Sequence, residues 1–416
     1  MKNLNSQVRL SSKKNAALKF RKELIRLFFI TMLIPLMFVN CASKKQAVLT
    51  DKNINEISCR RIIPDRPDVN ELIIRFNGDY LKAYYLLLDF RTPFEKKRDL
   101  KNGRLNGAVL VYLQAHSLRA DTAYDLTSTL ALNSKSGIVV VPVCDTPFGK
   151  DSQFRGDNGK DIVLMEVVKY VLNRNGVSLD GYVPITAEKI SIVRKKKEDY
   201  GKTEKLIPSK LMVLGISHGG LLSRRLACNY PDLVTDIAQI GSAGFGGQGR
   251  IWFIMSAGWE AGIKGPWGLR IRGKVRQAND HEWGVFRGLA GDGLRGWSSC
   301  LFGNFHIFKT ARWGQDAYDA SDILNDTNFP ASNLKSITVL FFKDDTLFEY
   351  TKQGGIADWK NITKTESDAF WEKHYPGNIT SGTNLLLKVL PGNHLAPYAY
   401  PEVCVQTVLK HSGQLL

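Results

Sequence analysis

Short apolar segments rich in β-branched residues alternate with helical patterns along most of the chain, and this alternation restricts the fold more than any other feature. From the third segment onward the apolar runs are continuous, which is typical of strands buried on both faces of a parallel sheet. Strand–helix alternation predicts an α/β fold with a mostly parallel, eight-stranded sheet flanked by helices. The predicted strands are 72–76, 84–90, 108–113, 138–143, 211–215, 237–240, 337–342 and 385–390. The predicted helices are 121–133, 161–173, 221–230 and 401–410.

The charge of the chain is unevenly distributed. Of 416 residues 44% are hydrophobic and 23% charged, which is the balance of a globular protein. The net charge is +17; residues 1–40 carry eight bases and one acid, a net +7, which leaves +10 for the rest. The excess of that remainder lies in 187–210 and 246–313. Such local patches argue against a nucleic-acid-binding protein and favour contact with anionic lipid or an anionic substrate.

The N-terminal segment has the pattern of an export signal. A basic stretch precedes an apolar run at 27–39, which is too short to span a bilayer but long enough for a signal-peptide core. The run ends at Cys41, so the segment resembles a bacterial lipoprotein signal, in which cleavage before the cysteine is followed by its acylation. Asn40 departs from the small residue usual there, and export without a lipid, or a cytosolic protein with an incorrect start, remain alternatives. We expect an exported lipoprotein facing the periplasm or the cell exterior, held to a membrane by a lipid anchor.

Ser217 is the candidate nucleophile. It is the central residue of a G-x-S-x-G motif, Gly215 to Gly219, which directly follows the apolar run 211–214 and precedes a helical pattern. A serine on such a strand-to-helix turn adopts a strained backbone, and small flanking glycines leave room for it. The start of the following helix also directs backbone N–H groups to the place where negative charge develops. The alternative is an ordinary tight turn that happens to carry a hydroxyl.

Two later motifs follow Ser217 in a consistent order. The acidic loop Phe341–Leu347 follows the seventh predicted strand, and Pro391–His394 follows the eighth. With these three motifs, residues 70–416 resemble an α/β-hydrolase, a family whose chain order is nucleophile, acid, histidine. The resemblance implies an α/β-hydrolase fold and acyl-transfer chemistry.

The resemblance also implies the roles of the acid and the histidine. His394 would be the general base that takes the Ser217 proton and later donates it to the leaving group. Asp345 would orient His394, because the run Asp345–Phe348 matches the family's pattern of an acid followed by apolar residues. Asp344 is the alternative acid, and both carboxylates as solvated turn residues is a further alternative.

The oxyanion hole is predicted from the same resemblance. One N–H donor is expected from His218, the residue after the nucleophile, and the other from the loop after the third strand, which contains His116. The family usually has His-Gly where this chain has Gln114 and Ala115. Backbone donors do not need a particular side chain, so His116 is either the donor residue or an ordinary loop histidine.

A long excursion rich in glycine and tryptophan lies between the sixth and seventh predicted strands, where the family inserts lid or cap segments. Its aromatic residues either form a small core of the cap or line an apolar acyl pocket or membrane-contact surface. It holds Trp252, Trp259, Trp267, Trp283, Trp297 and Trp313. The chain is therefore predicted to comprise a signal peptide (1–40), a lipidated cysteine and tether (41–66), the two parts of the hydrolase domain (67–245 and 336–416) and a lid (246–335).

These features together predict a serine hydrolase that cleaves carboxylic esters, with small-molecule or lipid esters as substrates and apolar acyl esters preferred. Neither a metal nor an organic cofactor is expected, because no cysteine–histidine spacing suggests a metal and the triad chemistry needs none. A non-catalytic surface lipoprotein or binding module on the same scaffold is the alternative, and the Gln114–Ala115 departure is its best support.

Overall fold

The computed structural model describes residues 61, 67–76, 79–115, 118–144, 160–179, 190–192, 206, 210–246 and 334–416. The predicted signal peptide, Cys41 and His116 lie outside the described residues. The same is true of the tether apart from Arg61, and of the predicted lid apart from Gly246 and its last two residues.

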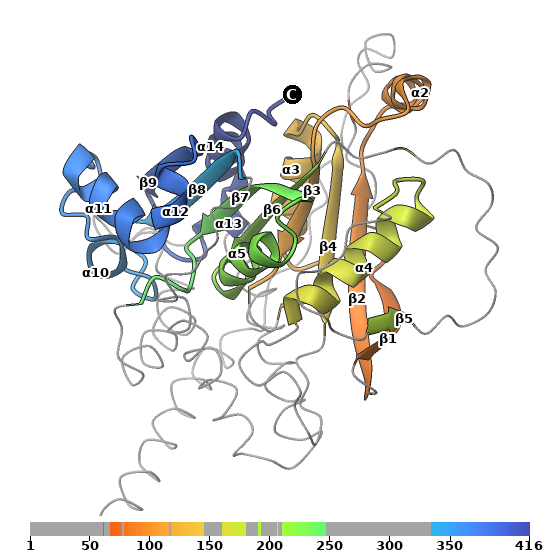
Figure 1. Ribbon diagram of the computed structural model, residues 1–416, viewed down its shortest axis with the longest axis horizontal. Helices are drawn as coiled ribbons and strands as arrows, with labels where there is room; N and C mark the ends of the chain where they lie inside the picture. Colours follow the sequence, from red (N-terminus) through yellow and green to blue (C-terminus); the bar gives the residue numbers. More distant parts are fainter. Residues whose placement is uncertain are drawn as a thin grey trace, which may run out of the picture.

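In the described part of the chain, nine strands form one sheet in the order β5-β1-β2-β4-β3-β6-β7-β8-β9 (Figure 1). The pairs at the β5 end (β5–β1, β1–β2 and β2–β4) are antiparallel, and every pair from β4 through β9 is parallel. The strands are β1 (Asn70–Phe76), β2 (Asp79–Asp89), β3 (Val109–Leu113), β4 (Ile138–Cys144), β5 (Ile190–Ile192), β6 (Leu211–Ile216), β7 (Val234–Ile240), β8 (Ser336–Phe342) and β9 (Asn384–Leu390).

The predicted fold class is confirmed: a mostly parallel sheet carries all eight predicted strands. The structure adds β5, a three-residue edge strand that lies within the basic segment 187–210 and pairs with β1. Strands from 67–245 and 336–416 pair directly through β7 and β8, so both parts of the predicted domain contribute to one sheet.

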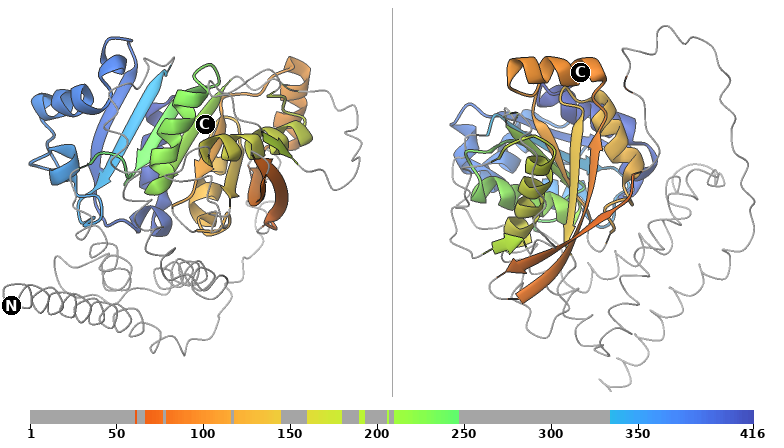
Figure 2. Two further views of the ribbon diagram at one scale, coloured as in Figure 1. Left: turned by 60° about the horizontal axis from the view of Figure 1, so that its bottom comes forward. Right: turned by 90° about the vertical axis from the view of Figure 1, so that its right-hand side faces the viewer.

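Helices cover both faces of the sheet, and the side chains of each strand alternate between the two faces. Val109, Val111 and Leu113 of β3 belong to one buried cluster, whereas Leu110 and Tyr112 belong to the other. The first cluster includes side chains of α4 (Lys160–Arg174), α5 (His218–Asn229) and α11 (Lys364–His374); the second includes those of α3 (Tyr124–Asn133) and α14 (Pro401–His411). Figure 2 shows α4 and α5 on one side of the sheet and α3 on the other.

The four predicted helices correspond to α3, α4, α5 and α14, with ends that agree within three residues. The sequence patterns did not predict the remaining helices, most of which are short. They are α2 (Pro93–Asn102), α10 (Tyr350–Gly354), α11, α12 (Pro376–Ile379) and α13 (Ala396–Ala399). None of the helices in the described residues combines the length and the apolar character that crossing a bilayer requires.

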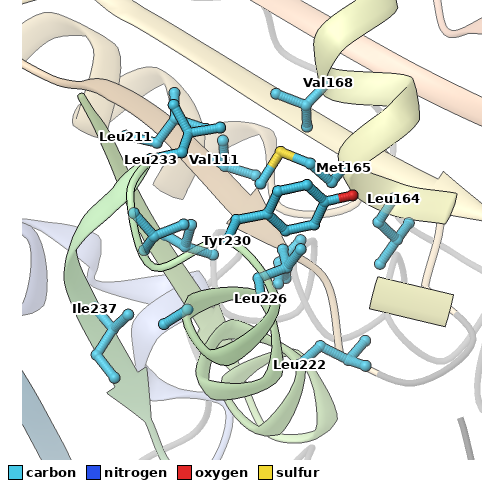
Figure 3. Close-up of a cluster of buried hydrophobic side chains, with 14 of the residues drawn as sticks. Val111, Leu164, Met165, Val168, Leu211, Leu222, Leu226, Tyr230, Leu233 and Ile237 are labelled. Atoms are coloured by element: carbon cyan, nitrogen blue, oxygen red, sulfur yellow. The ribbon is translucent and has the colours of Figure 1, made fainter. Parts of the chain in front are cut away.

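The core between α4, α5 and the sheet is larger than helical periodicity suggests. Met165 and Val168 are three residues apart and lie on one face of α4, but Val163 and Val167 are equally buried. The helix packs against β4 and also against α5, so it buries more than one stripe. Figure 3 shows Tyr230, at the end of α5, lying among Leu164 and Met165 of α4 and Leu226 of α5.

β9 differs from the expectation that strands from the third onward are buried on both faces. It lies at an edge of the sheet, and its Asn384 and Lys388 are exposed. An edge strand has a neighbour on one side only, so one of its faces is incompletely covered.

The parallel register aligns the ends of four strands. Ile216 of β6 pairs with Ile240 of β7, Ile240 pairs with Leu340 of β8, and Phe342 of β8 pairs with Leu390 of β9. Because parallel strands run in one direction, the segments that follow them emerge at the same edge of the sheet. These segments contain Ser217 and the two loops predicted to hold the acid and the histidine.

Candidate active site

Ser217 occupies a strained turn between β6 and α5. Its backbone has φ 56° and ψ −122°, and among the described residues it is the only non-glycine residue with a positive φ. A side chain in this region is disfavoured by about 1–3 kcal/mol, so the surrounding structure must hold it there. The Ser217 N–H donates to the Ile240 carbonyl, and its carbonyl accepts from the N–H groups of Gly220 and Ala243, each at 3.1 Å.

The glycines of the motif are required by close backbone approach. A Cβ on Gly215 would lie 2.3 Å from the carbonyl of Gly219. A Cβ on Gly219 would lie 2.1 Å from the Leu113 carbonyl oxygen at the end of β3. Both distances are shorter than any real contact of a Cβ atom, so the turn is compatible only with glycine at these two positions.

His394 is hydrogen bonded to Asp345. The His394 Nδ1 lies 2.9 Å from the Asp345 Oδ2, and both side chains are buried, with 7% and 3% of the residue exposed. The other carboxylate oxygen accepts the backbone N–H groups of Leu347 at 2.8 Å and Phe348 at 3.0 Å. These bonds compensate the removal of the carboxylate from water. An ionised carboxylate only accepts, so Nδ1 carries the proton and Nε2 is the nitrogen left to act as a base.

The acid loop and the histidine loop are joined through their backbones. The Lys343 N–H donates to the Leu390 carbonyl at 2.9 Å, and the Asp344 N–H donates to the Gly392 carbonyl at 2.8 Å. Asp344, the alternative acid, is half-buried and fixes the loops together through its main chain. Of the two candidates it is the Asp345 carboxylate that is placed against the imidazole of His394.

Gly241 lies between the serine and the Asp345–His394 pair. It follows Ile240, whose carbonyl binds the Ser217 N–H, and its own N–H donates to the Leu340 carbonyl at 2.7 Å. A Cβ on Gly241 would lie 3.3 Å from His394 Nδ1 and 3.4 Å from Asp345 Oδ2. Gly241 thus adjoins both the β7 residue that binds Ser217 and the Asp345–His394 pair, and the structure brings all three predicted residues to one edge of the sheet. The sequence analysis missed Gly241, for which a glycine directly after a buried strand was the available signal.

A buried polar network stabilises the turn that carries Ser217. Gln239 of β7 is fully buried, and its amide nitrogen donates to the Gly220 carbonyl at 3.0 Å and to the Ser242 hydroxyl at 3.1 Å. The hydroxyl of Tyr375 donates to the amide oxygen. The network holds the first turn of α5, whose Gly220 N–H binds the Ser217 carbonyl. The sequence analysis also missed Gln239, although a polar residue within a buried strand was visible there.

The predicted oxyanion hole is described only in part. His218 is the first residue of α5, which is the position expected for one N–H donor. His116 lies outside the described residues. The neighbouring Gln114 is buried, and its side chain donates to the carbonyls of Arg119 at 3.0 Å and Ala120 at 3.3 Å. The Gln114 side chain therefore stabilises the loop after β3. It occupies a position where α/β-hydrolases usually have histidine.

Within the described ranges, no group of three or more histidine, cysteine or acidic side chains is placed to hold a metal ion. The groups at this edge are a hydroxyl, an imidazole and a carboxylate. Groups of these three types can together support nucleophilic attack assisted by proton transfer.

Comparison with known proteins finds no matching family model and no matching curated protein. Among solved structures, the chain resembles a thermophilic esterase from Thermogutta terrifontis at 12% identity and a TM-score of 0.44, covering 82% of this chain and 97% of that one. It resembles an α/β hydrolase fold protein from Burkholderia ambifaria at 13% identity and a TM-score of 0.44, covering 84% and 100%. It also resembles a probable hydrolytic enzyme from Pseudomonas aeruginosa at 14% identity and a TM-score of 0.41, covering 83% and 94%. Likenesses at this level say nothing about substrate or site residues.

Replacing Ser217 by glycine should stabilise the protein. Glycine adopts a positive φ without steric conflict, and its greater freedom in the unfolded chain offsets part of the gain. We expect the free energy of unfolding of Ser217→Gly to exceed that of Ser217→Ala by about 1 kcal/mol, measured by urea denaturation of the whole chain. Alanine keeps the strain and loses only the hydroxyl, so it is the matched control. Equal stability of the two variants would contradict a strained turn.

Proposed function

We propose that the protein is a serine hydrolase that cleaves carboxylic esters, with Ser217 as nucleophile, His394 as general base and acid, and Asp345 as the orienting carboxylate. The observation that carries this proposal is the Asp345–His394 hydrogen bond at the edge of the sheet where the strained Ser217 turn also lies. A binding module has no need of a strained serine at the same edge of the sheet as a buried, oriented imidazole.

The reaction follows from the proton positions. Nε2 of His394 takes the proton of the Ser217 hydroxyl while its oxygen attacks the ester carbonyl carbon. The resulting oxyanion is stabilised by backbone N–H donors, of which His218 at the start of α5 supplies one. The imidazolium, held by Asp345, then gives its proton to the leaving alkoxide, and the alcohol departs. Water, deprotonated by His394, attacks the acyl-enzyme, and the carboxylic acid leaves as Ser217 regains its proton.

The proposed substrates are esters with an apolar acyl chain. The proposal is supported by the six tryptophans of residues 246–335, which suit an apolar acyl pocket. We propose in addition that Cys41 is acylated and that the protein faces the periplasm or the cell exterior.

A fluorophosphonate reagent should label the wild-type chain at Ser217. Such reagents react with a serine hydroxyl that an adjacent base activates. We expect labelling of the wild type and none of Ser217→Ala, as detected by intact-mass spectrometry. Absence of labelling in a folded wild-type sample would favour the non-catalytic binding module.

The two aspartates provide the matched control for this assignment. Asp345→Asn keeps the shape of the side chain but removes the charge that orients His394, so ester turnover should fall by about 10⁴-fold. Asp344→Asn leaves the backbone bond to Gly392 in place, so turnover should stay within a factor of a few. The reverse pattern would transfer the orienting role to Asp344.

Ester turnover should increase with acyl length. Each additional methylene group that enters an apolar pocket contributes about 0.8 kcal/mol, or roughly fourfold in kcat/KM, until the pocket is filled. The measurement compares p-nitrophenyl esters from acetate to laurate below their micelle concentrations. A preference for acetate that detergent and vesicles leave unchanged would argue against an apolar acyl substrate.

Substitution of Cys41 should release the protein from membranes. Acyl chains on this residue provide stable anchoring, which the loss of the thiol prevents. We expect Cys41→Ala to move into the soluble fraction of a bacterial host, while Cys144→Ala, a buried cysteine of β4, stays with the membranes. Unchanged fractionation of Cys41→Ala would rule out lipidation at this position.

A further inference from the structure

Helix α2 separates its charges by sign. Its two acids, Glu95 and Asp99, are buried, whereas Lys97 and Lys101 are exposed. Arg61 binds Glu95 at 2.7 Å between Nη2 and Oε1. Asp99 is bound by Arg91 at 3.2 Å and by Arg98 at 2.9 Å. The two acids therefore form ion pairs inside the protein, and the outer surface of the helix is basic.

The pKa of Glu95 supports this separation. Burial alone would raise its pKa, but the hydrogen bond and charge of Arg61, with the backbone N–H of Thr92, hold the pKa below its ordinary value. The Glu95 carboxylate is thus ionised, and its charge is compensated by Arg61 inside the protein. Lys97, Lys101 and nearby Arg104 have no carboxylate partner within the part of the chain described.

Two large apolar side chains accompany these cations. Phe94, in the first turn of α2, is 71% exposed, and Leu100 is 46% exposed. Phe94 shares one side of the helix with Lys97 and Lys101, because residues three, four and seven apart lie on one face. Leu100 is three residues beyond Lys97 and adjoins the same face. Isolated exposed apolar residues are common, but an aromatic ring beside lysines that lack a carboxylate partner among the described residues has the composition of an interfacial membrane helix.

We propose that this basic–apolar face of α2 docks the folded domain onto an anionic lipid bilayer. Phe94 and Leu100 would enter the headgroup region, and Lys97, Lys101 and Arg104 would lie against lipid phosphates. An adjoining hollow lined by Arg98 and Arg104 suits a headgroup phosphate; Asp99 also lines it, but its carboxylate is already paired with Arg91 and Arg98.

The route of the chain supports a membrane as the occupant of this surface. Arg61 is fixed beside α2: besides Glu95, its guanidinium donates to the carbonyls of Ala131 at 2.9 Å and of Lys135 at 3.1 Å. Only residues 42–60 separate Arg61 from Cys41. A chain anchored at Cys41 therefore joins the folded domain on the side where α2 lies.

Docking through α2 also sets the orientation of the proposed active site. The helix lies beyond the end of β2, at the edge of the sheet where β3 and β4 begin (Figure 1). Ser217 and the Asp345–His394 pair follow the opposite ends of the parallel strands. The candidate site would thus face away from the bilayer that holds the protein, and its ester would arrive from the aqueous side. The orientation of the active site extends the proposed hydrolysis and rests on it. The docking of α2 onto the bilayer does not depend on the proposed hydrolysis.

The test is co-sedimentation of the full chain, carrying Cys41→Ala to remove acylation, with vesicles of phosphatidylcholine alone or mixed with phosphatidylglycerol. We expect binding to the anionic vesicles that decreases with salt. Lys97→Glu with Lys101→Glu should weaken it by more than about 30-fold, since each lysine contributes about fivefold and each glutamate adds repulsion from the anionic lipid. Phe94→Ala should weaken it by about tenfold without changing the salt dependence.

The matched control is Lys364→Glu with Lys373→Glu, which changes the net charge equally at two exposed lysines of α11. It should change vesicle binding by less than about twofold if the effect is local to α2. Equal weakening by both pairs, no weakening by the α2 pair, or equal binding to neutral vesicles would overturn the proposal. Binding of polyglutamate through α2 without binding of vesicles would also overturn it, in favour of an acidic protein partner.

Hydrolysis of a soluble short-chain ester separates this proposal from the proposed function. The α2 variants should retain that activity, because α2 lies at the far edge of the sheet from Ser217. Loss of vesicle binding with intact hydrolysis supports docking through α2. If the protein lacks hydrolase activity but its vesicle binding still depends on α2, the docking proposal stands and the proposed function is wrong.

Discussion

The parallel register of β6, β7, β8 and β9 is the constraint on which the candidate site depends. It brings Ile216, Ile240 and Leu340 into line, so that residues far apart in the sequence leave the sheet at one edge. Backbone hydrogen bonds then continue past the strands: Ser217 binds Ile240, and Gly241 binds Leu340. The segments that carry the serine, imidazole and carboxylate are therefore positioned by main-chain hydrogen bonds. A shift of one residue between these strands would separate them, because it would move each following side chain to the other face.

The same edge contains a strained backbone and buried polar side chains. Ser217 has a strained backbone, and Gln239 and Asp345 are polar side chains removed from water. Each is stabilised by specific partners: Gly220 and Ala243 hold the Ser217 carbonyl, and Leu347 and Phe348 bind the Asp345 carboxylate. The two hydrophobic clusters on either face of the sheet supply the free energy that keeps this arrangement in place. Strain maintained in this way is characteristic of preorganised sites.

The two ends of the parallel strands differ in chemistry. At the end near Ser217, a single acid is paired with a histidine inside the protein. At the other end, the acids of α2 are paired internally and its lysines face outward. A tally of charges along the sequence does not reveal this difference, because it places the two acids of residues 93–102 among four bases without showing which side chains are buried. Only the packing of the helix, which buries Glu95 and Asp99 against arginines from other segments, separates the two signs.

The sequence by itself determined the strand order along the chain, the main helices, and the motifs around Ser217, Asp345 and His394, because these features are local: an apolar run, a helical period, a glycine-flanked turn. It left Asp344 and Asp345 as alternatives and did not single out Gly241 or Gln239, since their importance lies in what approaches them across the sheet. The three-residue strand β5 was missed for the same reason, because its pairing with β1 joins segments more than a hundred residues apart. Tertiary structure alone decided which carboxylate meets His394 and which face of α2 is charged, because both depend on contacts between segments that periodicity and spacing do not encode.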